Sequence, residues 1–298
     1  MSLRTIVQRL GVEPECVRLI KRGGNTHWSV ASARGRFVLR RYGTDGVLDR
    51  SPASIRWEHE LVTKLAARGY PAVAAVHPAR ELDGATYALF PYRRGRTWRF
   101  RGGEADYRRL GALLADYHAI AATLGPRDQR PGWRRFDAAT VPARGGVARR
   151  DRLLAILRGV DAETARLAAT TARAIEPRLA ASGVRSLPAL PIHGDFSPWN
   201  LAFHRGSLSA VLDFDLAHLD VRAADICFAR RGHHDAVVRV YRERAALGDS
   251  EVAVLDALWK ASILLVLWRL VEVRGAALRR SELRWTVEQL VKTRPYRD

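Results

Sequence analysis

Three polar residues in the C-terminal half of the sequence have the types and the spacing of groups that act together in a chemical reaction. Asn200 lies five positions after Asp195, and Asp213 lies thirteen positions after Asn200. Each is next to an apolar run that could form a buried strand. A carboxylate can accept a proton from an attacking hydroxyl, and carboxylate and amide oxygens are the ligands that Mg²⁺ prefers. The layout therefore fits transfer of a phosphoryl group from a nucleotide.

The residues around these three form two short motifs. The tripeptide at 193–195 reads His-Gly-Asp and precedes Asn200, and the tripeptide at 213–215 reads Asp-Phe-Asp. This is the order of a kinase catalytic loop followed by a metal-binding aspartate. Either piece alone could be an ordinary loop, because Asp and Asn are common in turns. The ordered set favours the kinase interpretation.

With these motifs the sequence resembles the aminoglycoside phosphotransferase and choline kinase family, whose fold is similar to that of protein kinases. Glycine in the first motif, and aspartate where Asp-Phe-Gly has its glycine, point to the small-molecule branch. The resemblance implies that Asp195 is the catalytic base and that Asn200 and Asp213 hold Mg²⁺. It also implies that ATP or GTP is the phosphoryl donor.

The resemblance further implies an α+β, bilobal, protein-kinase-like fold. Residues 1–92 would form an N-lobe with a five-stranded antiparallel sheet and one helix, and residues 93–298 a mostly helical C-lobe with the catalytic loop and the acceptor-binding helices. Hydrophobic periodicity and turn signals agree with this division. They predict strands at 17–20, 28–31, 36–42, 73–76 and 86–90, and helices at 1–14, 54–68, 107–122, 151–181, 255–273 and 282–291.

Several residues are candidates for contacts with the nucleotide. Gly23 and Gly24 separate the first two strands, and a glycine turn lets backbone N–H groups approach phosphates, although a plain hairpin is the alternative. By resemblance, the backbone from Phe90 to Tyr92 would bond the adenine edge. Ser197 could donate to a phosphate or form an ordinary serine turn.

A cation for the phosphates is expected on the third strand. The family usually carries a lysine there, and the matching residue is Arg40. Arg41 is the alternative, because neighbouring residues of a strand face opposite sides and only one of the two can enter the cleft. In the family the next helix supplies a glutamate that pairs with this cation. Glu58 fits that position best, and Glu60 is second.

The resemblance also implies supporting residues in the C-lobe. Asp225 would brace the catalytic loop, and His118 would be a structural hydrogen-bonding residue. The region 125–150 is rich in Arg, Gly and Pro and is predicted to be a loop across or beside the acceptor site.

Composition limits the partners. The net charge is +19 and the pI about 11.1, which could indicate nucleic-acid binding, but the excess is mostly arginine scattered along the chain. Nucleic acid is therefore an unlikely partner, and a polycationic acceptor is disfavoured relative to a neutral or anionic one. The alternative function is an inactive nucleotide-binding protein or a basic nucleic-acid-binding protein on a kinase-like fold.

The sequence contains no targeting signal that would place the protein outside the cytoplasm. The N-terminus lacks the apolar core of a signal peptide, and no apolar run is long enough to span a membrane. Cys16 and Cys227 have no metal-ligand spacing and are too few to form a disulfide framework, so a reducing cytoplasm is expected. The sequence leaves open the acceptor (an antibiotic, amino alcohol, sugar or similar molecule), the choice between ATP and GTP, and the oligomeric state.

Overall fold

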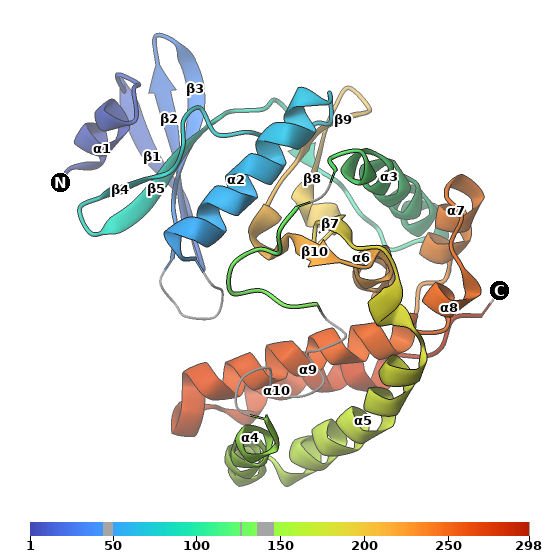
Figure 1. The fold of residues 1–298 in the computed structure, drawn as a ribbon. Helices are drawn as coiled ribbons and strands as arrows, with labels where there is room; N and C mark the ends of the chain where they lie inside the picture. The colour runs from blue at the N-terminus through green and yellow to red at the C-terminus, as the bar shows by residue number, and fades with distance from the viewer. Residues whose placement is uncertain (44–49, 126, 136–145, 298) are drawn as a thin grey trace. The chain divides into compact units, whose positions relative to one another are not determined.

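A computed structural model describes residues 1–43, 50–125, 127–135 and 146–297 (Figure 1). The chain divides into two compact units, and each is described separately. The first unit consists of Met1–Arg99, Arg130–Gly132 and Pro198–Asp215. The second consists of Phe100–Gln129, Trp133–Ser197 and Leu216–Asp298. The units differ from the two predicted lobes in that residues 93–99, 130–132 and 198–215 group with the N-terminal sheet.

The first unit contains the predicted five-stranded antiparallel sheet. Its strand order is β1-β2-β3-β5-β4, formed by β1 (Cys16–Arg22), β2 (Thr26–Ser32), β3 (Gly35–Arg41), β4 (Arg80–Leu82) and β5 (Ala85–Pro91). The prediction of a strand at 73–76 is wrong, because the fourth strand is β4. Pro71 and Pro78 flank the segment, so a ladder could not be extended past it by a proline N–H. Val76 instead donates a single hydrogen bond to the Leu89 carbonyl at 2.8 Å.

Two helices cover opposite faces of this sheet. Helix α1 (Leu3–Arg9) packs on the face that carries Leu39 and Leu89. Helix α2 (Pro52–Ala67) places Ile55 against Ala88, on the other face (Figure 1). Since side chains alternate along a strand, residues of β3 next to Leu39 point toward α2. The α2 face is therefore the one that receives Arg40.

A small three-stranded sheet completes the first unit. It has the order β6-β8-β9, with β6 (Arg96–Thr97), β8 (Leu201–His204) and β9 (Ser207–Val211). Strands β8 and β9 form a hairpin between the two motifs. Its turn contains Arg205 and Gly206, both with positive φ. The Leu212 N–H donates to the Asn200 carbonyl at 2.8 Å, so the hairpin brings residues 200 and 212 next to each other.

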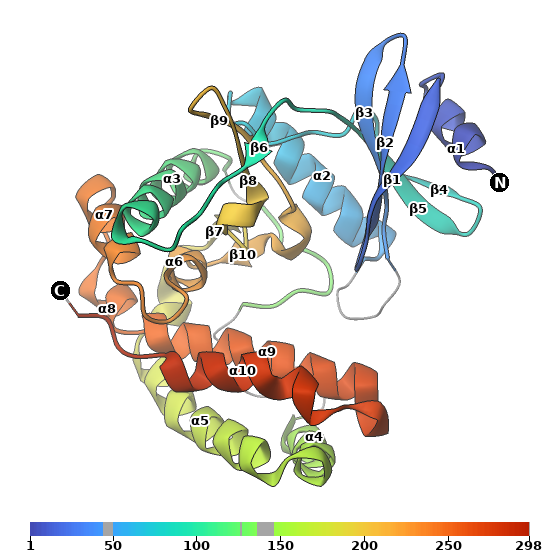
Figure 2. The same ribbon diagram turned by 180° about the vertical axis from the view of Figure 1, so that it is seen from behind.

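The second unit is mostly helical, as predicted. A short ribbon joins β7 (Leu190–Ile192) to β10 (His218–Asp220). Helix α9 is the central element, with Trp259 and Trp268 in the core, and it contacts α4, α5, α6 and α10 (Figure 2). The helices are α3 (Glu104–Ala122), α4 (Gly146–Val160), α5 (Ala162–Ala181), α6 (Arg222–Arg230), α7 (Ala236–Arg244), α8 (Asp249–Val252), α9 (Leu255–Arg274) and α10 (Arg280–Lys292).

The segment 151–181, predicted to be helical, consists of most of α4, which ends at Val160, and of α5, which begins at Ala162. No helix in the described ranges combines the length and the apolar character needed to cross a bilayer. The cytoplasmic location stays a prediction.

Helices α3 and α7 approach closely at Gly111. A Cβ at this position would lie 2.3 Å from the Val237 carbonyl oxygen, so Gly111→Ala forces the two helices apart. We expect the free energy of unfolding to fall by about 2 kcal/mol, as for other overpacked cores. Urea unfolding measures it. Gly159→Ala in α4 is the matched control, because a Cβ there meets nothing within 4 Å and helix propensity favours alanine. Equal effects of the two substitutions would contradict this account.

Candidate active site

Arg40 and Glu58 form a buried ion pair inside the first unit. The Nη1 of Arg40, on β3, donates to Glu58 Oε1, on α2, at 3.2 Å. Both side chains are buried, whereas Arg41 is exposed. Burial alone would lower the pKa of the Arg40 guanidinium, but Tyr42 and Glu58 outweigh this effect and the pKa is raised. Arg40 therefore remains a cation in a dry environment, as binding of a phosphate requires.

A second carboxylate, that of Asp215, lies against the same guanidinium. It forms an ion pair with Arg40, accepts a hydrogen bond from Asn25 Nδ2 at 2.6 Å, and lies 3.3 Å from Arg50 Nη2. Asp215 was not predicted as a site residue, although the sequence shows an aspartate at the position where the kinase motif Asp-Phe-Gly has its glycine. The third residue of this motif thus contributes a charge that binds two arginines.

The other oxygen of Glu58 binds a further guanidinium, that of Arg130. The Arg130 Nη2 donates to Glu58 Oε2 at 3.1 Å. The region 125–150 was predicted to be a loop. This prediction is wrong for residues 146–150, which are helical and begin α4. Arg130, which lies earlier in the region, packs against α2. Residues 126 and 136–145 lie outside the described part of the chain.

Asn200 and Asp213 lie at the open end of the β8–β9 hairpin. Asn200 is buried, and Asp213 has a positive φ of 62° and a side chain that is 53% exposed. The Asp213 Oδ1 is 4.0 Å from Arg40 Nη2. The first unit therefore brings together Arg40, Glu58 and Asp213, three of the predicted site residues.

The donor set fits Mg²⁺. An amide oxygen and a carboxylate are hard ligands, and Mg²⁺ commonly takes one or two protein oxygens and fills its remaining positions with phosphates and water. Among the described residues no cluster of three or more His, Cys, Asp or Glu side chains could hold a metal ion by itself.

The catalytic-loop motif belongs to the second unit and requires its glycine. Gly194 has a φ of 81°, and a Cβ there would lie 2.2 Å from the Leu216 carbonyl oxygen. Arginine, as in the protein-kinase motif, would not fit this backbone. The following residue, Asp195, has a side chain that is 28% exposed and lies 3.8 Å from Arg231 Nη2.

Asp225 braces this loop as predicted. Its two carboxylate oxygens accept the backbone N–H groups of His193 and Gly194, both at 2.7 Å. His118 is the predicted structural residue: its Nε2 is 3.1 Å from Asp225 Oδ2, and its Nδ1 is 2.8 Å from the Tyr241 hydroxyl. The buried carboxylate therefore fixes the backbone that carries Asp195.

Three other predicted residues lie in segments that connect strands or helices. Gly23 and Gly24 form the bend between β1 and β2, and the two strands make a hairpin there. Ser197 is buried, and its hydroxyl donates to the Asp195 carbonyl at 3.3 Å. Contacts of these residues with a nucleotide stay predictions.

The predicted adenine-binding backbone is the end of β5. Phe90 pairs with Val38 in the sheet, and the Tyr92 N–H donates to the Arg36 carbonyl at 2.9 Å. This N–H group is therefore used within the sheet. The predicted contact with the adenine edge depends on the remaining backbone groups of residues 90–92.

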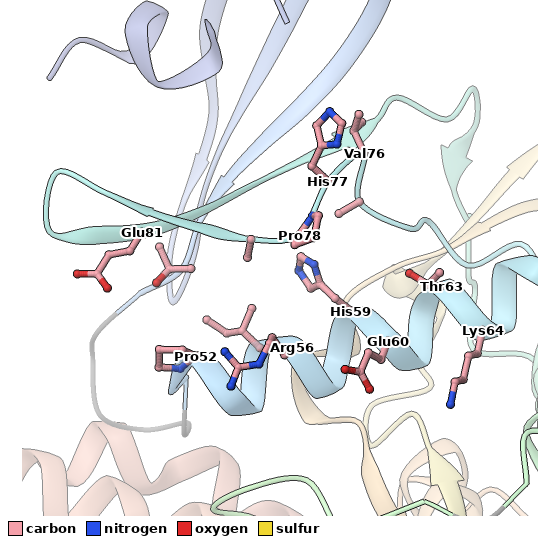
Figure 3. A pocket seen from close by; sticks show the side chains of 14 residues that line it. Pro52, Arg56, His59, Glu60, Thr63, Lys64, Val76, His77, Pro78 and Glu81 are labelled. Carbon is pink, nitrogen blue, oxygen red and sulfur yellow. The ribbon is translucent and has the colours of Figure 1, made fainter. Parts of the chain in front are cut away.

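A cavity of about 590 Å³ lies between α2 and the segment 75–81 (Figure 3). Figure 3 shows His59 extending from α2 toward Pro78. The His59 Nε2 is hydrogen-bonded to the Tyr42 hydroxyl at 2.7 Å. None of the residues predicted to bind nucleotide is among the lining side chains, so this cavity is not the predicted nucleotide site.

The Asp225 network predicts a pH dependence of stability. Burial acts to raise the pKa of Asp225, but the His118 hydrogen bond and the His193 N–H outweigh it, and the pKa lies below its usual 3.8. A lowered pKa stabilises the fold above pH 3.8, and this stabilisation is lost as pH falls through the folded-state pKa. We expect Asp225→Asn to cost about 3 kcal/mol at neutral pH. Urea unfolding should show the difference from wild type shrinking below pH 3.8, and a pH-independent difference would contradict the assignment.

The fold is similar to those of several solved phosphotransferases. A thermostable mutant of aminoglycoside phosphotransferase APH(4)-Ia, in a ternary complex with ADP and hygromycin B, has a TM-score of 0.68 and 14% identity over 98% of this chain and 97% of that one. The microcompartment-associated aminopropanol kinase has a TM-score of 0.60 and 17% identity over 97% and 93%. Macrolide 2'-phosphotransferase MphH from Brachybacterium faecium has a TM-score of 0.59 and 18% identity over 98% of this chain and 97% of that one. These similarities confirm the predicted kinase-like fold.

The sequence itself supports a family assignment. No curated protein sequence matches the chain. The model of the phosphotransferase enzyme family matches residues 17–231, which is well over half of the chain and includes both motifs. The chain therefore belongs to the phosphotransferase enzyme family.

Proposed function

We propose that this phosphotransferase transfers the γ-phosphoryl group of ATP or GTP to a hydroxyl group of a small molecule. The observation that carries the proposal is the buried Arg40–Glu58 pair with Asp213 4.0 Å from the same guanidinium. A fixed cation beside a carboxylate at a hairpin end is an arrangement that serves binding of a metal–triphosphate complex. Proteins with the same fold include one in complex with ADP and hygromycin B and one named an aminopropanol kinase.

Each proposed residue has one role. Arg40 binds the phosphates, and Glu58 fixes the orientation of its guanidinium. Asn200 and Asp213 would hold Mg²⁺, which, when bound, neutralises charge on the phosphate oxygens. Asp195 orients the acceptor hydroxyl and takes its proton as the phosphoryl group is transferred. Acceleration by such a site comes mainly from positioning and charge neutralisation.

Asp215 adds a step to nucleotide binding. Its carboxylate forms an ion pair with the guanidinium that the phosphates would approach, so we expect nucleotide phosphates and Asp215 to compete for the charge of Arg40. Asp215 balances the charge of Arg40 and Arg50.

The acceptor is proposed only as a class. The solved relatives include proteins named for an aminoglycoside, a macrolide and an amino alcohol. The net charge of +19 disfavours a polycation at long range unless the acceptor site is locally acidic. A neutral or anionic alcohol fits the charge best.

Asp195→Asn tests the proton acceptor. An amide cannot take the hydroxyl proton, so we expect kcat to fall on the order of 10³-fold or more while nucleotide affinity is retained. Acceptor-dependent ADP release and calorimetric titration with nucleotide measure the two quantities. Asp249→Asn, in a side chain that is 97% exposed, is the matched control and should leave both unchanged. An active Asp195→Asn enzyme would remove Asp195 from this role.

Asp213→Ala tests the proposed metal ligand. Loss of a carboxylate ligand should weaken Mg²⁺-dependent nucleotide binding at least about tenfold, as losses at metal sites typically do. Titrations with and without Mg²⁺ separate this effect from a general loss of affinity, because metal-free binding should change little. Equal Mg²⁺-dependent affinities of variant and wild type would show that Asp213 does not hold the metal.

A further inference from the structure

Arg130 makes an unusually complete set of contacts for a residue that no sequence motif includes. It is 2% exposed, and Trp57 lies beneath its guanidinium at 5.9 Å. Its Nε donates to Ser54 Oγ at 2.8 Å and its Nη2 to Glu58 Oε2 at 3.1 Å. Its Nη1 donates to the carbonyl groups of residues 214 and 215, at 3.2 and 3.0 Å. One guanidinium therefore uses all three nitrogens within the first unit.

The acceptors of these hydrogen bonds lie on two different elements. Ser54 and Glu58 are one turn apart on α2, so they form one face of the helix. The two carbonyl groups belong to Phe214 and Asp215, which follow Asp213 directly. Because the guanidinium is planar and rigid, four hydrogen bonds to it fix both the rotation of α2 and the path of the backbone after Asp213.

Core stability alone does not explain an arginine here. Taking an ion out of water costs several kcal/mol, and well-packed apolar residues of the same volume are often as stable as a buried ion pair. What only arginine supplies is the fork of donors with fixed geometry. The cluster is nevertheless balanced in charge, since three cations accompany three carboxylates: Arg40, Arg50, Arg130, Glu58, Asp213 and Asp215.

We propose that Arg130 is a positioning residue for phosphoryl transfer. It holds Glu58 through one carboxylate oxygen, so that the other oxygen orients Arg40, and it holds the 214–215 backbone, so that Asp213 is correctly directed. This role rests on the function proposed above for the site. Arg130 acts through Glu58 and Asp213 and has no contact with substrate in this assignment.

Two substitutions separate geometry from charge. Arg130→Met keeps the length of the side chain and removes every donor. Arg130→Lys keeps the charge, but an ammonium group is a point donor and cannot reach helix and backbone together. We expect both to raise KM for MgATP and to lower kcat/KM on the order of 10²-fold, because small displacements of a catalytic arrangement have effects of this size. Failure of the lysine variant to restore activity is the signature of a geometric role.

The matched control is Arg178→Met in the second unit. Arg178 binds Asp256 through both Nη atoms, at 2.8 and 2.9 Å, and the Ala253 carbonyl at 3.1 Å. The substitution removes the same kinds of hydrogen bond at a site that has no proposed role in the reaction. We expect a lower melting temperature with kcat/KM within about twofold of wild type, because Arg178 and Arg130 share no hydrogen-bond partner.

Each variant is assayed at temperatures where circular dichroism shows that it is folded. A loss of activity under these conditions is not caused by unfolding. If Arg130→Met does not fold, Ser54→Ala decides, because it removes a single anchor and should raise KM for MgATP in the same direction. Folded Arg130→Lys and Ser54→Ala enzymes with wild-type kcat/KM would overturn the role of Arg130 and leave the proposed function intact. A wild-type enzyme that transfers no phosphoryl group would overturn the proposed function, and this role with it.

Discussion

The carboxylate of Glu58 lies between two buried arginines, and the first unit depends on this arrangement. One oxygen of Glu58 accepts a hydrogen bond from the guanidinium of Arg40, on β3, and the other accepts one from the guanidinium of Arg130, which follows α3 in the sequence. One carboxylate cannot neutralise two buried cations, so a second is required, and Asp215 provides it. The helix, the sheet and the segment after the β8–β9 hairpin are thereby held to one another by charge and by the geometry of hydrogen bonds.

The loop that carries the proposed catalytic base, Asp195, is held in a different way. In the second unit the buried carboxylate of Asp225 forms hydrogen bonds with two backbone N–H groups and with an imidazole. None of these three partners is a guanidinium. In the first unit the Glu58 carboxylate orients other side chains, whereas in the second unit the Asp225 carboxylate fixes a segment of backbone. A proton acceptor needs a defined backbone position, whereas a phosphate-binding cation needs a fixed charge direction, so the difference suits the proposed roles.

Sequence patterns predicted whatever depended on local or periodic signals. Alternation along β3 explains why Arg40 and not Arg41 pairs with Glu58, and the hairpin after Asn200 turns at Arg205 and Gly206, between two apolar runs. Arg130 could not be predicted, because its partners lie 72 to 85 residues away and its neighbours form no motif. The false strand at 73–76 shows the opposite error: the apolar run between Pro71 and Pro78 has the composition of a strand, but it forms no ladder, and its bond to the sheet is that of the Val76 N–H to the Leu89 carbonyl.

The central claim is that the protein phosphorylates a small-molecule hydroxyl. The most direct measurement is incubation of the wild-type enzyme with Mg²⁺, γ-labelled ATP or GTP and a panel of antibiotics, amino alcohols and sugars, with mass spectrometry of each acceptor. We expect label on one class of acceptor in amounts equal to the ADP or GDP released, and none when Mg²⁺ is omitted. Nucleotide binding with no labelled acceptor, and hydrolysis to free phosphate at the same rate with and without acceptors, would contradict the claim.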